Sequence, residues 1–199
     1  MDYRELAGRV IEGGETSRAE GEAILDSPDE DLLALLDGAF LIRREYFGRS
    51  VQIHQLMNAK SGRCPEDCSY CSQSAVSEAE IEKYGLLDHE RLLEGARRAS
   101  EAGSRRYCMV ISGRGPTDAE IGHLAEAVRK IKADSEVSIC LSLGLLGEDQ
   151  ARRLKEAGVD RLNHNLNTSE RHYAEICTTH TYGDRLETLA AARGAGLEL

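Results

Sequence analysis

The sequence lacks long hydrophobic runs, an excess of positive charge and low-complexity segments, and each absence excludes a class of protein. No stretch reaches the roughly 18 consecutive apolar residues that a membrane-spanning helix requires. Only 3 of the 199 residues are proline and 41% are hydrophobic, which excludes fibrous and disordered proteins. We therefore expect a globular protein with one large domain or two small ones.

The charge balance argues against nucleic acid and membranes as partners. The 35 acidic residues outnumber the 25 lysines and arginines, which gives a net charge of −10. Such a chain repels phosphate backbones and anionic lipids. The N-terminus, Met1 to Glu5, has no basic segment followed by an apolar one, so the sequence predicts a cytoplasmic protein.

The six cysteines are the most informative residue type. Reducing conditions in the cytoplasm disfavour disulfides, so cysteines there indicate metal binding or catalysis first. Three of them crowd together as Cys64, Cys68 and Cys71, whereas the other three, Cys108, Cys140 and Cys177, stand apart.

Residues 1–50 are predicted to be helical and to form an N-terminal helical cap. Ser27 and Glu30 have the spacing of a capping box, with Pro28 at the first helical position. An apolar stripe at helical spacing follows between Leu32 and Leu41. This segment is assigned no chemistry.

From residue 51 the pattern changes to short strands that alternate with amphipathic helices. Strands are predicted at 51–57, 106–112, 137–143 and 159–166, and a fifth begins at Leu197. Helices are predicted at 89–102, 117–132, 148–157 and 184–193, with a capping box formed by Thr117 and Glu120. Gly103, Gly158 and Gly196 each follow a helix, where a positive φ ends it.

The βα repeat predicts an α/β fold with parallel strands, either an open doubly wound sheet or a (β/α) barrel. In both, functional groups gather at the carboxyl ends of the strands. A closed barrel needs eight units and about 250 residues. Residues 51–199 supply about four to five βα units, fewer than a closed barrel needs.

The clustered cysteines form a C-x3-C-x2-C array directly after the first predicted strand. Three thiolates select zinc, copper(I) or iron–sulfur, and not magnesium or calcium. A structural zinc site needs a fourth ligand, which His54 or a distant cysteine would supply. Three cysteines around a [4Fe–4S] cluster instead leave one iron open to another ligand.

This array, with Tyr70 before the last cysteine, resembles the signature of radical S-adenosylmethionine (SAM) enzymes. Further motifs resemble the biotin synthase family in order and spacing over residues 50–199. They are Gly62 to Ser74, Arg106 to Met109, Asn163 to Ser169 and Thr178 to Tyr182.

The resemblance implies an incomplete TIM-type (β/α) barrel of the radical SAM kind, with about four to five βα units preceded by the helical segment. It also implies a sulfurtransferase that converts dethiobiotin to biotin. In that family SAM is cleaved at a [4Fe–4S] cluster to a 5′-deoxyadenosyl radical, and a [2Fe–2S] cluster donates the sulfur. It also implies an electron donor such as flavodoxin or ferredoxin, and a homodimer when the protein is full length. The protein supplies placement and exclusion of water, while the cofactors supply the chemistry.

The resemblance also assigns residues, none of them catalytic beyond the ligands of the cofactors. Cys64, Cys68 and Cys71 would hold the [4Fe–4S] cluster, and Cys108 and Cys140 the [2Fe–2S] cluster. SAM would be bound by Tyr70, Asn167 and Arg185, and dethiobiotin by Asn163 and Asn165.

The residues themselves allow other interpretations. Asn163 and Asn165 lie two apart, so on a strand both face one way and suit a ligand with a carbonyl and two N–H groups. They would equally satisfy loop backbone at the end of a strand. Cys108 and Cys140 would otherwise be small buried hydrophobes. Cys177 is interpreted as inert, and His54, His164 and His180 as packing or supporting residues.

The sequence departs from the family at two places. Many members have an aspartate where this chain has Asn167, so we expect weaker SAM binding. The family would place a third [2Fe–2S] ligand just after Leu199 and an arginine ligand much later, which predicts a truncated chain. The alternatives left open are another radical SAM enzyme of the same barrel group and a non-catalytic zinc- or cluster-binding fragment.

Overall fold

The computed structural model describes residues 1–199, which divide into two compact units, Met1–Gln52 and Ile53–Leu199. The first unit is helical and contains α1 (Tyr3–Ile11), α2 (Arg18–Leu25), a 3-10 turn η1 (Asp29–Asp31) and α3 (Leu32–Phe47). Helix α1 packs on α3, and Gly38 allows the approach, since a Cβ there would lie 2.6 Å from the Tyr3 carbonyl oxygen. No helix in either unit is both long enough and apolar enough to cross a membrane.

The capping box predicted at Ser27 is wrong. The Ser27 hydroxyl donates to the Ala23 carbonyl at 3.0 Å and lies 2.6 Å from the Tyr3 hydroxyl. Pro28 precedes η1 and no side chain caps it. The Ser27 hydroxyl therefore bonds to the end of α2 and to Tyr3 of α1. It does not cap the next helix, as the sequence pattern predicts.

The second unit contains a four-stranded parallel sheet in the order β1-β2-β3-β4. Its strands are β1 (His54–Lys60), β2 (Arg106–Ile111), β3 (Ser138–Ser142) and β4 (Arg161–Leu162). Its helices are α4 (His89–Glu101), α5 (Asp118–Asp134), α6 (Glu148–Glu156), α7 (Tyr173–Ile176) and α8 (Tyr182–Gly194), with a 3-10 turn η2 (Glu170–His172) before α7.

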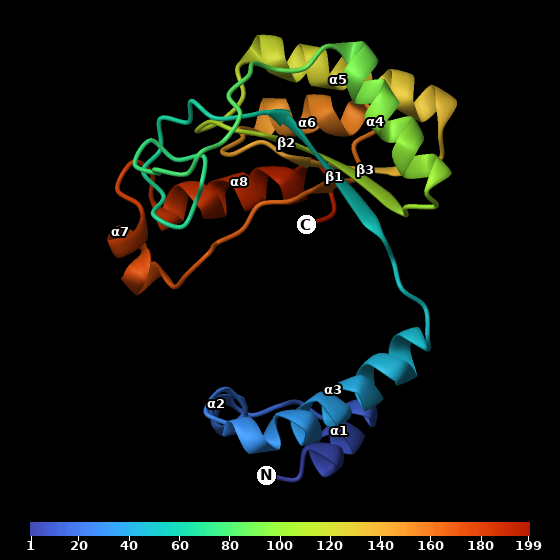
Figure 1. The fold of residues 1–199 in the computed structure, drawn as a ribbon, viewed down its shortest axis with the longest axis vertical. Coiled ribbons are helices and arrows are strands. Elements are labelled where there is room, and N and C mark those ends of the chain that lie inside the picture. Colours follow the sequence, from blue (N-terminus) through green and yellow to red (C-terminus); the bar gives the residue numbers. More distant parts are fainter. The chain divides into compact units, whose positions relative to one another are not determined.

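Helices α4, α5 and α6 lie on one face of this sheet (Figure 1). The strand side chains that face them are buried, including Tyr107, Met109, Ile139 and Leu141. Strands in chain order with helices on one face are the arrangement of a barrel, because a doubly wound sheet carries helices on both faces. The unit is an α/β fold in the form of an incomplete (β/α) barrel, as predicted.

Most predicted elements are confirmed within one to three residues. The capping box of Thr117 and Glu120 is formed at the start of α5. Gly103, Gly158 and Gly196 have φ of 68°, 101° and 76° after helices α4, α6 and α8. At the C-terminus, the Glu198 N–H donates to the Asp160 carbonyl at 3.0 Å, so the chain pairs beside β4 where the fifth strand was predicted to begin.

Two strands have boundaries that differ from the prediction. Strand β1 begins at His54 and not at Val51, because pairing with β2 starts there and residues 51–53 are exposed. Strand β4 covers two residues and not eight, because β3 ends at Ser142 and leaves the chain after Asn163 without a partner. Helix α8 begins two residues early, at Tyr182, since Thr181 caps it through the Asp184 N–H.

Candidate cofactor site

The cysteine loop begins where β1 ends and is held in shape by hydrogen bonds to its backbone. Gly62 and Arg63 have positive φ, 68° and 55°, which turns the chain away from the sheet. The Gly62 N–H donates to the Gln73 side chain at 2.8 Å, and the Ser112 hydroxyl donates to the Gly62 carbonyl at 2.6 Å. These bonds fix the base of the loop at the carboxyl ends of β1 and β2.

A second segment, residues 173–185, packs against this loop. The Asp67 carboxylate accepts hydrogen bonds from the N–H groups of Thr178 and Thr179 at 2.9 and 3.2 Å. A hydrogen bond from the Thr178 hydroxyl, together with the one from the Thr178 N–H, holds the pKa of Asp67 well below its usual range. The Ser69 N–H also donates to the Ile176 carbonyl at 2.9 Å. The conformation of the cysteine loop therefore depends on residues more than 100 positions later in the chain.

The three loop cysteines share one cavity of about 180 Å³. All three are free thiols, and Cys68 is buried while Cys64 and Cys71 are partly exposed. Burial raises the pKa of the Cys68 thiol to about 12, with a further contribution from the neighbouring Cys177. Tyr70 and Arg185 line the same cavity, so the structure brings together five of the predicted site residues.

Arg185 is fixed by four partners around this cavity. Its guanidinium donates to the Asn165 carbonyl at 2.9 Å, to the Tyr70 hydroxyl at 3.4 Å and to His180 Nε2 at 2.9 Å. It also donates to the Tyr173 hydroxyl. A guanidinium held in this way is oriented in advance for a carboxylate.

The remaining SAM candidate, Asn167, is joined to the same group. Its side-chain amide donates to the Tyr70 hydroxyl, and its backbone has a φ of 68°. Asparagine tolerates this left-handed conformation better than most residues. Burial raises the pKa of Tyr70 to about 12, so the hydroxyl stays protonated.

Glu66 and His180, which also line the cavity, form a buried pair. The Glu66 carboxylate accepts from His180 Nδ1 and from the Thr179 hydroxyl, the latter at 2.8 Å. Arg114 lies 3.5 Å from the same oxygen. With Nδ1 donating to Glu66, His180 Nε2 is left to accept from Arg185.

Cys108 and Cys140 lie on the helix-free face of the sheet and not in the cavity. They are direct partners in the register of β2 and β3, and Arg161 of β4 is the next partner. Interaction between the two sulfurs lowers the pKa of Cys140 and raises that of Cys108. Two paired thiols on one face can act as ligands to a shared metal centre.

The two predicted substrate residues point the same way as these cysteines. Asn163 and Asn165 are exposed, while His164 and Leu166 between and after them are partly buried. The alternation of a strand therefore continues beyond the end of β4. Asn163 has the same parity as Arg161, which places it beyond the row of Cys108 and Cys140 on the helix-free face.

The structure weakens one alternative for the cysteine loop. His54 starts β1, whereas the loop leaves the far end of that strand. Six residues of strand separate them by roughly 20 Å. His54 is thus too distant to be a fourth ligand.

Cys177, which the sequence analysis interpreted as inert, lies beside the loop. Its sulfur is 3.7 Å from Cys68 Sγ and 3.2 Å from His180 Nδ1. Its position after the short helix α7 is the reason that sequence reasoning missed it, since neither η2 nor α7 was predicted. His164 also lines the cavity, and burial lowers its pKa to about 4.

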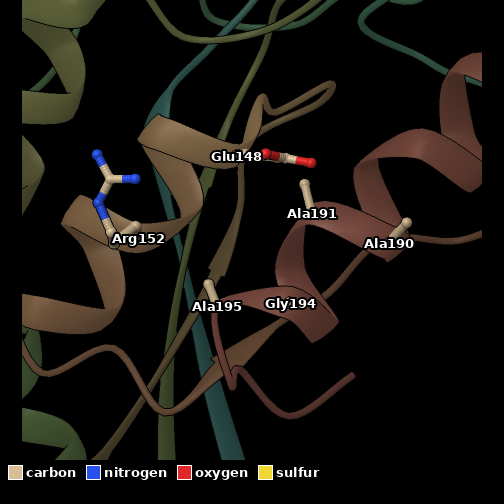
Figure 2. A pocket seen from close by; sticks show the side chains of 6 residues that line it. All are labelled: Glu148, Arg152, Ala190, Ala191, Gly194 and Ala195. Carbon is tan, nitrogen blue, oxygen red and sulfur yellow. The ribbon is translucent and has the colours of Figure 1, made fainter.

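A separate cavity of about 260 Å³ lies between α6 and α8 (Figure 2). Four of its six lining residues are alanine or glycine, and its polar side chains are those of Glu148 and Arg152. Arg152 points away from α8 in this view and pairs with Asp149. This cavity holds no cysteine and none of the predicted site residues.

Comparison with known proteins supports the assignment of the cysteine loop. Residues 59–199 match the radical SAM superfamily. The biotin synthase of Halalkalibacterium halodurans is 52% identical over 197 residues, and that of Lysinibacillus sphaericus is 53% identical over the same length. In each case the match covers 99% of this chain, which spans 59% of the relative's length.

Solved structures show the same fold. The crystal structure of methylornithine synthase has a TM-score of 0.84 at 22% identity, over 96% of this chain and 56% of that one. The FeFe-hydrogenase maturase of Carboxydothermus hydrogenoformans has a TM-score of 0.79 at 21% identity, over 98% of this chain and 46% of that one. With a matching profile over most of its length and an incomplete barrel carrying C-x3-C-x2-C after its first strand, the chain belongs to the radical SAM superfamily.

Proposed function

We propose that the chain forms the SAM-binding part of a biotin synthase, a sulfurtransferase that makes biotin from dethiobiotin. The observation that carries the proposal is the shared cavity of Cys64, Cys68, Cys71, Tyr70 and Arg185 at the carboxyl ends of the strands. Identity above 50% to biotin synthases over 99% of the chain supports this substrate over those of other radical SAM enzymes.

The donor set fits a [4Fe–4S] cluster. Three free thiols within eight residues, in a pocket that also presents a guanidinium and a phenol, suit a cluster with one open iron. Such a cluster and SAM, when bound, supply a 5′-deoxyadenosyl radical. In this proposal Cys64, Cys68 and Cys71 ligate the iron.

Tyr70 and Arg185 of the cavity, with Asn167 bonded to Tyr70, would bind and orient SAM. Arg185 faces its carboxylate, and the four contacts of the guanidinium hold this charge in place without reorganisation. Tyr70 packs on the adenine side, and Asn167 accepts from the ribose. Their mutual hydrogen bond couples the two positions.

Dethiobiotin would lie on the helix-free face, with its ureido ring on Asn163 and Asn165. Cys108 and Cys140 supply two of the four ligands that a [2Fe–2S] cluster takes. The other two belong, in this proposal, to the part of a biotin synthase that lies beyond the matched region. From Cys108, β2 runs roughly 13 Å to Ser112 at the base of the cysteine loop, so the two sets of cysteines would hold separate clusters.

The organisation follows the same proposal. Residues 1–50 form the helical cap and residues 51–199 the partial barrel. The working enzyme is a cytoplasmic homodimer that receives electrons from a flavodoxin or ferredoxin.

Anaerobic reconstitution tests the proposal. The chain, loaded with iron and sulfide and supplied with a reductant, is expected to bind four irons per cysteine loop and to cleave SAM to 5′-deoxyadenosine and methionine. Joined to the remainder of a biotin synthase, it should consume dethiobiotin. Failure to bind a [4Fe–4S] cluster contradicts the proposal, and SAM cleavage that never depends on dethiobiotin in the complete enzyme points to another radical SAM reaction.

A further inference from the structure

Arg185 carries a positive charge that no acidic side chain neutralises. Its guanidinium donates only to uncharged acceptors, which are the Asn165 carbonyl, the hydroxyls of Tyr70 and Tyr173, and His180 Nε2. No carboxylate lies within ion-pair distance of this guanidinium. The cavity therefore presents an unpaired positive charge to whatever anionic group enters it.

A buried carboxylate lies on the other side of His180. Glu66 is 5% exposed, lines the same cavity and accepts from His180 Nδ1. The His180 imidazole, which is 6% exposed, thus lies between an anion and a cation that attract each other strongly in a buried site. Direct contact between Glu66 and Arg185 would neutralise the charge that the cavity presents.

Glu66 has partners of its own and is satisfied without Arg185. The Thr179 hydroxyl donates to the Glu66 carboxylate at 2.8 Å, and the Arg114 guanidinium lies 3.5 Å from the same oxygen. Arg114 also donates to the Thr179 carbonyl, which holds it on this side of the imidazole. With His180 as a third donor, the buried carboxylate has the hydrogen bonds that it needs. The charges therefore divide into a Glu66–Arg114 pair and a separate Arg185.

A neutral imidazole suits this position because it has one donor and one acceptor on different edges of the ring. Nδ1–H donates to Glu66, and the lone pair of Nε2 accepts from Arg185 at 2.9 Å. Cys177 Sγ, 3.2 Å from Nδ1, is a weaker acceptor than the carboxylate. The ring therefore orients Arg185 through an uncharged contact and keeps the two opposite charges apart.

We propose that His180 is a positioning residue that orients Arg185 for the carboxylate of SAM and separates it from Glu66, so that the guanidinium is not neutralised within the protein. This inference rests on the proposed function, since that function supplies the ligand of Arg185. The separation of Glu66 from Arg185 is a property of the cluster-free chain and has a test of its own.

The SAM affinity of the reconstituted chain, measured by calorimetry, tests the role of His180 toward the ligand. His180→Ala allows Glu66 and Arg185 to form an ion pair and should weaken SAM binding by at least roughly tenfold. The addition of Glu66→Gln to this variant removes the competing carboxylate and should recover most of the loss. If His180 only fills space, the second substitution recovers nothing, and that result overturns the proposal.

Two matched comparisons sharpen this measurement. The amide of His180→Gln can donate to Glu66 and accept from Arg185, so this variant should bind SAM within about threefold of the wild type. Decarboxylated SAM lacks the group that Arg185 would face, so its affinity should be the same in the wild-type chain and in His180→Ala. If His180→Ala weakens the binding of both ligands equally, the substitution has damaged the cavity as a whole and the proposal is wrong.

The cluster-free chain provides a test that needs no SAM. Glu66→Gln and Arg185→Gln, made singly and together, give the coupling between the two residues from urea unfolding. We expect little coupling when His180 is present and a larger, stabilising coupling in the His180→Ala chain. Equal coupling in both chains overturns the proposal. If the reconstituted chain binds neither a cluster nor SAM, the proposed function fails, and this coupling still decides whether His180 separates the charges.

Discussion

The two groups of cysteines in this molecule are positioned in different ways. Cys108 and Cys140 face each other in the register of β2 and β3, so a backbone ladder sets their spacing. Cys64, Cys68 and Cys71 lie in a loop whose shape depends on side chains such as Gln73 and Asp67 and on a segment far along the chain. Ligands on strands inherit the rigidity of the core, whereas ligands on a loop depend on a few polar contacts.

The largest expected effect separates the two groups directly. Cys71→Ser should abolish the [4Fe–4S] cluster, because three thiolates are needed to hold it. Cys108→Ser should leave this cluster intact, since its side chain lies on the helix-free face of the sheet. Iron and sulfide analysis with electron paramagnetic resonance checks both variants. If both lose the [4Fe–4S] cluster equally, the two groups of cysteines do not act separately.

The strand group should respond most to changes in the core. Leu141 is fully buried on the helix side of β3, next to Cys140. Leu141→Ala should lower the free energy of unfolding by about 2–5 kcal/mol through the lost contacts and the cavity that remains. Urea denaturation followed by circular dichroism measures it. The same truncation at the exposed Leu25 is the control and should cost little.

The loop group should respond to its charged partner. Arg185→Lys keeps the charge but loses the fork that contacts Asn165, Tyr70 and His180 together. We expect SAM affinity to fall roughly tenfold, consistent with the loss of about one charge-assisted hydrogen bond. Calorimetry on the reconstituted chain measures this fall, and Arg193→Lys, exposed at the end of α8, should bind as the wild type does.

Acid should weaken the loop side of the molecule before the sheet side. Burial lowers the pKa of His164 to about 4 from its usual 6.5, so the folded state resists protonation that the unfolded state accepts. The contribution of His164 to the free energy of unfolding is therefore fully present above pH 6.5. It falls as the pH drops towards 4, because protons then bind the unfolded state more readily than the folded one. His164→Asn should make the free energy of unfolding less dependent on pH in this interval, and an unchanged slope would show that another group titrates.

The smallest expected effect concerns Asn167. Asn167→Asp adds a charge-assisted acceptor for the SAM ribose and retains a residue that tolerates a φ of 68°. SAM should bind a few times more tightly in calorimetry. An unchanged affinity would show that an aspartate at this position binds SAM no better than the asparagine does.

The sequence predicted the parts of the fold that local rules govern. Apolar periodicity and the glycines at 103, 158 and 196 predict the βα repeat, because each rule acts over a few residues. The boundary of β4 could not be predicted, since it depends on where its neighbour β3 ends. The capping box at Ser27 failed for a similar reason, because the Tyr3 hydroxyl competes for the serine.

The residues of the candidate site also separate into those that the sequence predicts and those that only the tertiary structure places. Cys64, Cys68 and Cys71 are recognisable from spacing alone, and Arg185 and Tyr70 from a resemblance. The place of Cys177 beside Cys68 was not predictable, because it depends on how a segment with only short helices folds back on the loop. Glu66 lay within the motif, yet its burial and its bond to His180 required the tertiary structure.

The order of strands in the sheet has a consequence for how the protein is made. Since β1, β2, β3 and β4 pair in the order in which a ribosome produces them, each new unit can dock on the one before it. The cysteine loop is different, because the residues that close it, Thr178 and Thr179, are synthesised more than 100 residues after Asp67. The loop therefore reaches its final shape only after all four strands have been synthesised, when the segment with Thr178 and Thr179 packs on it.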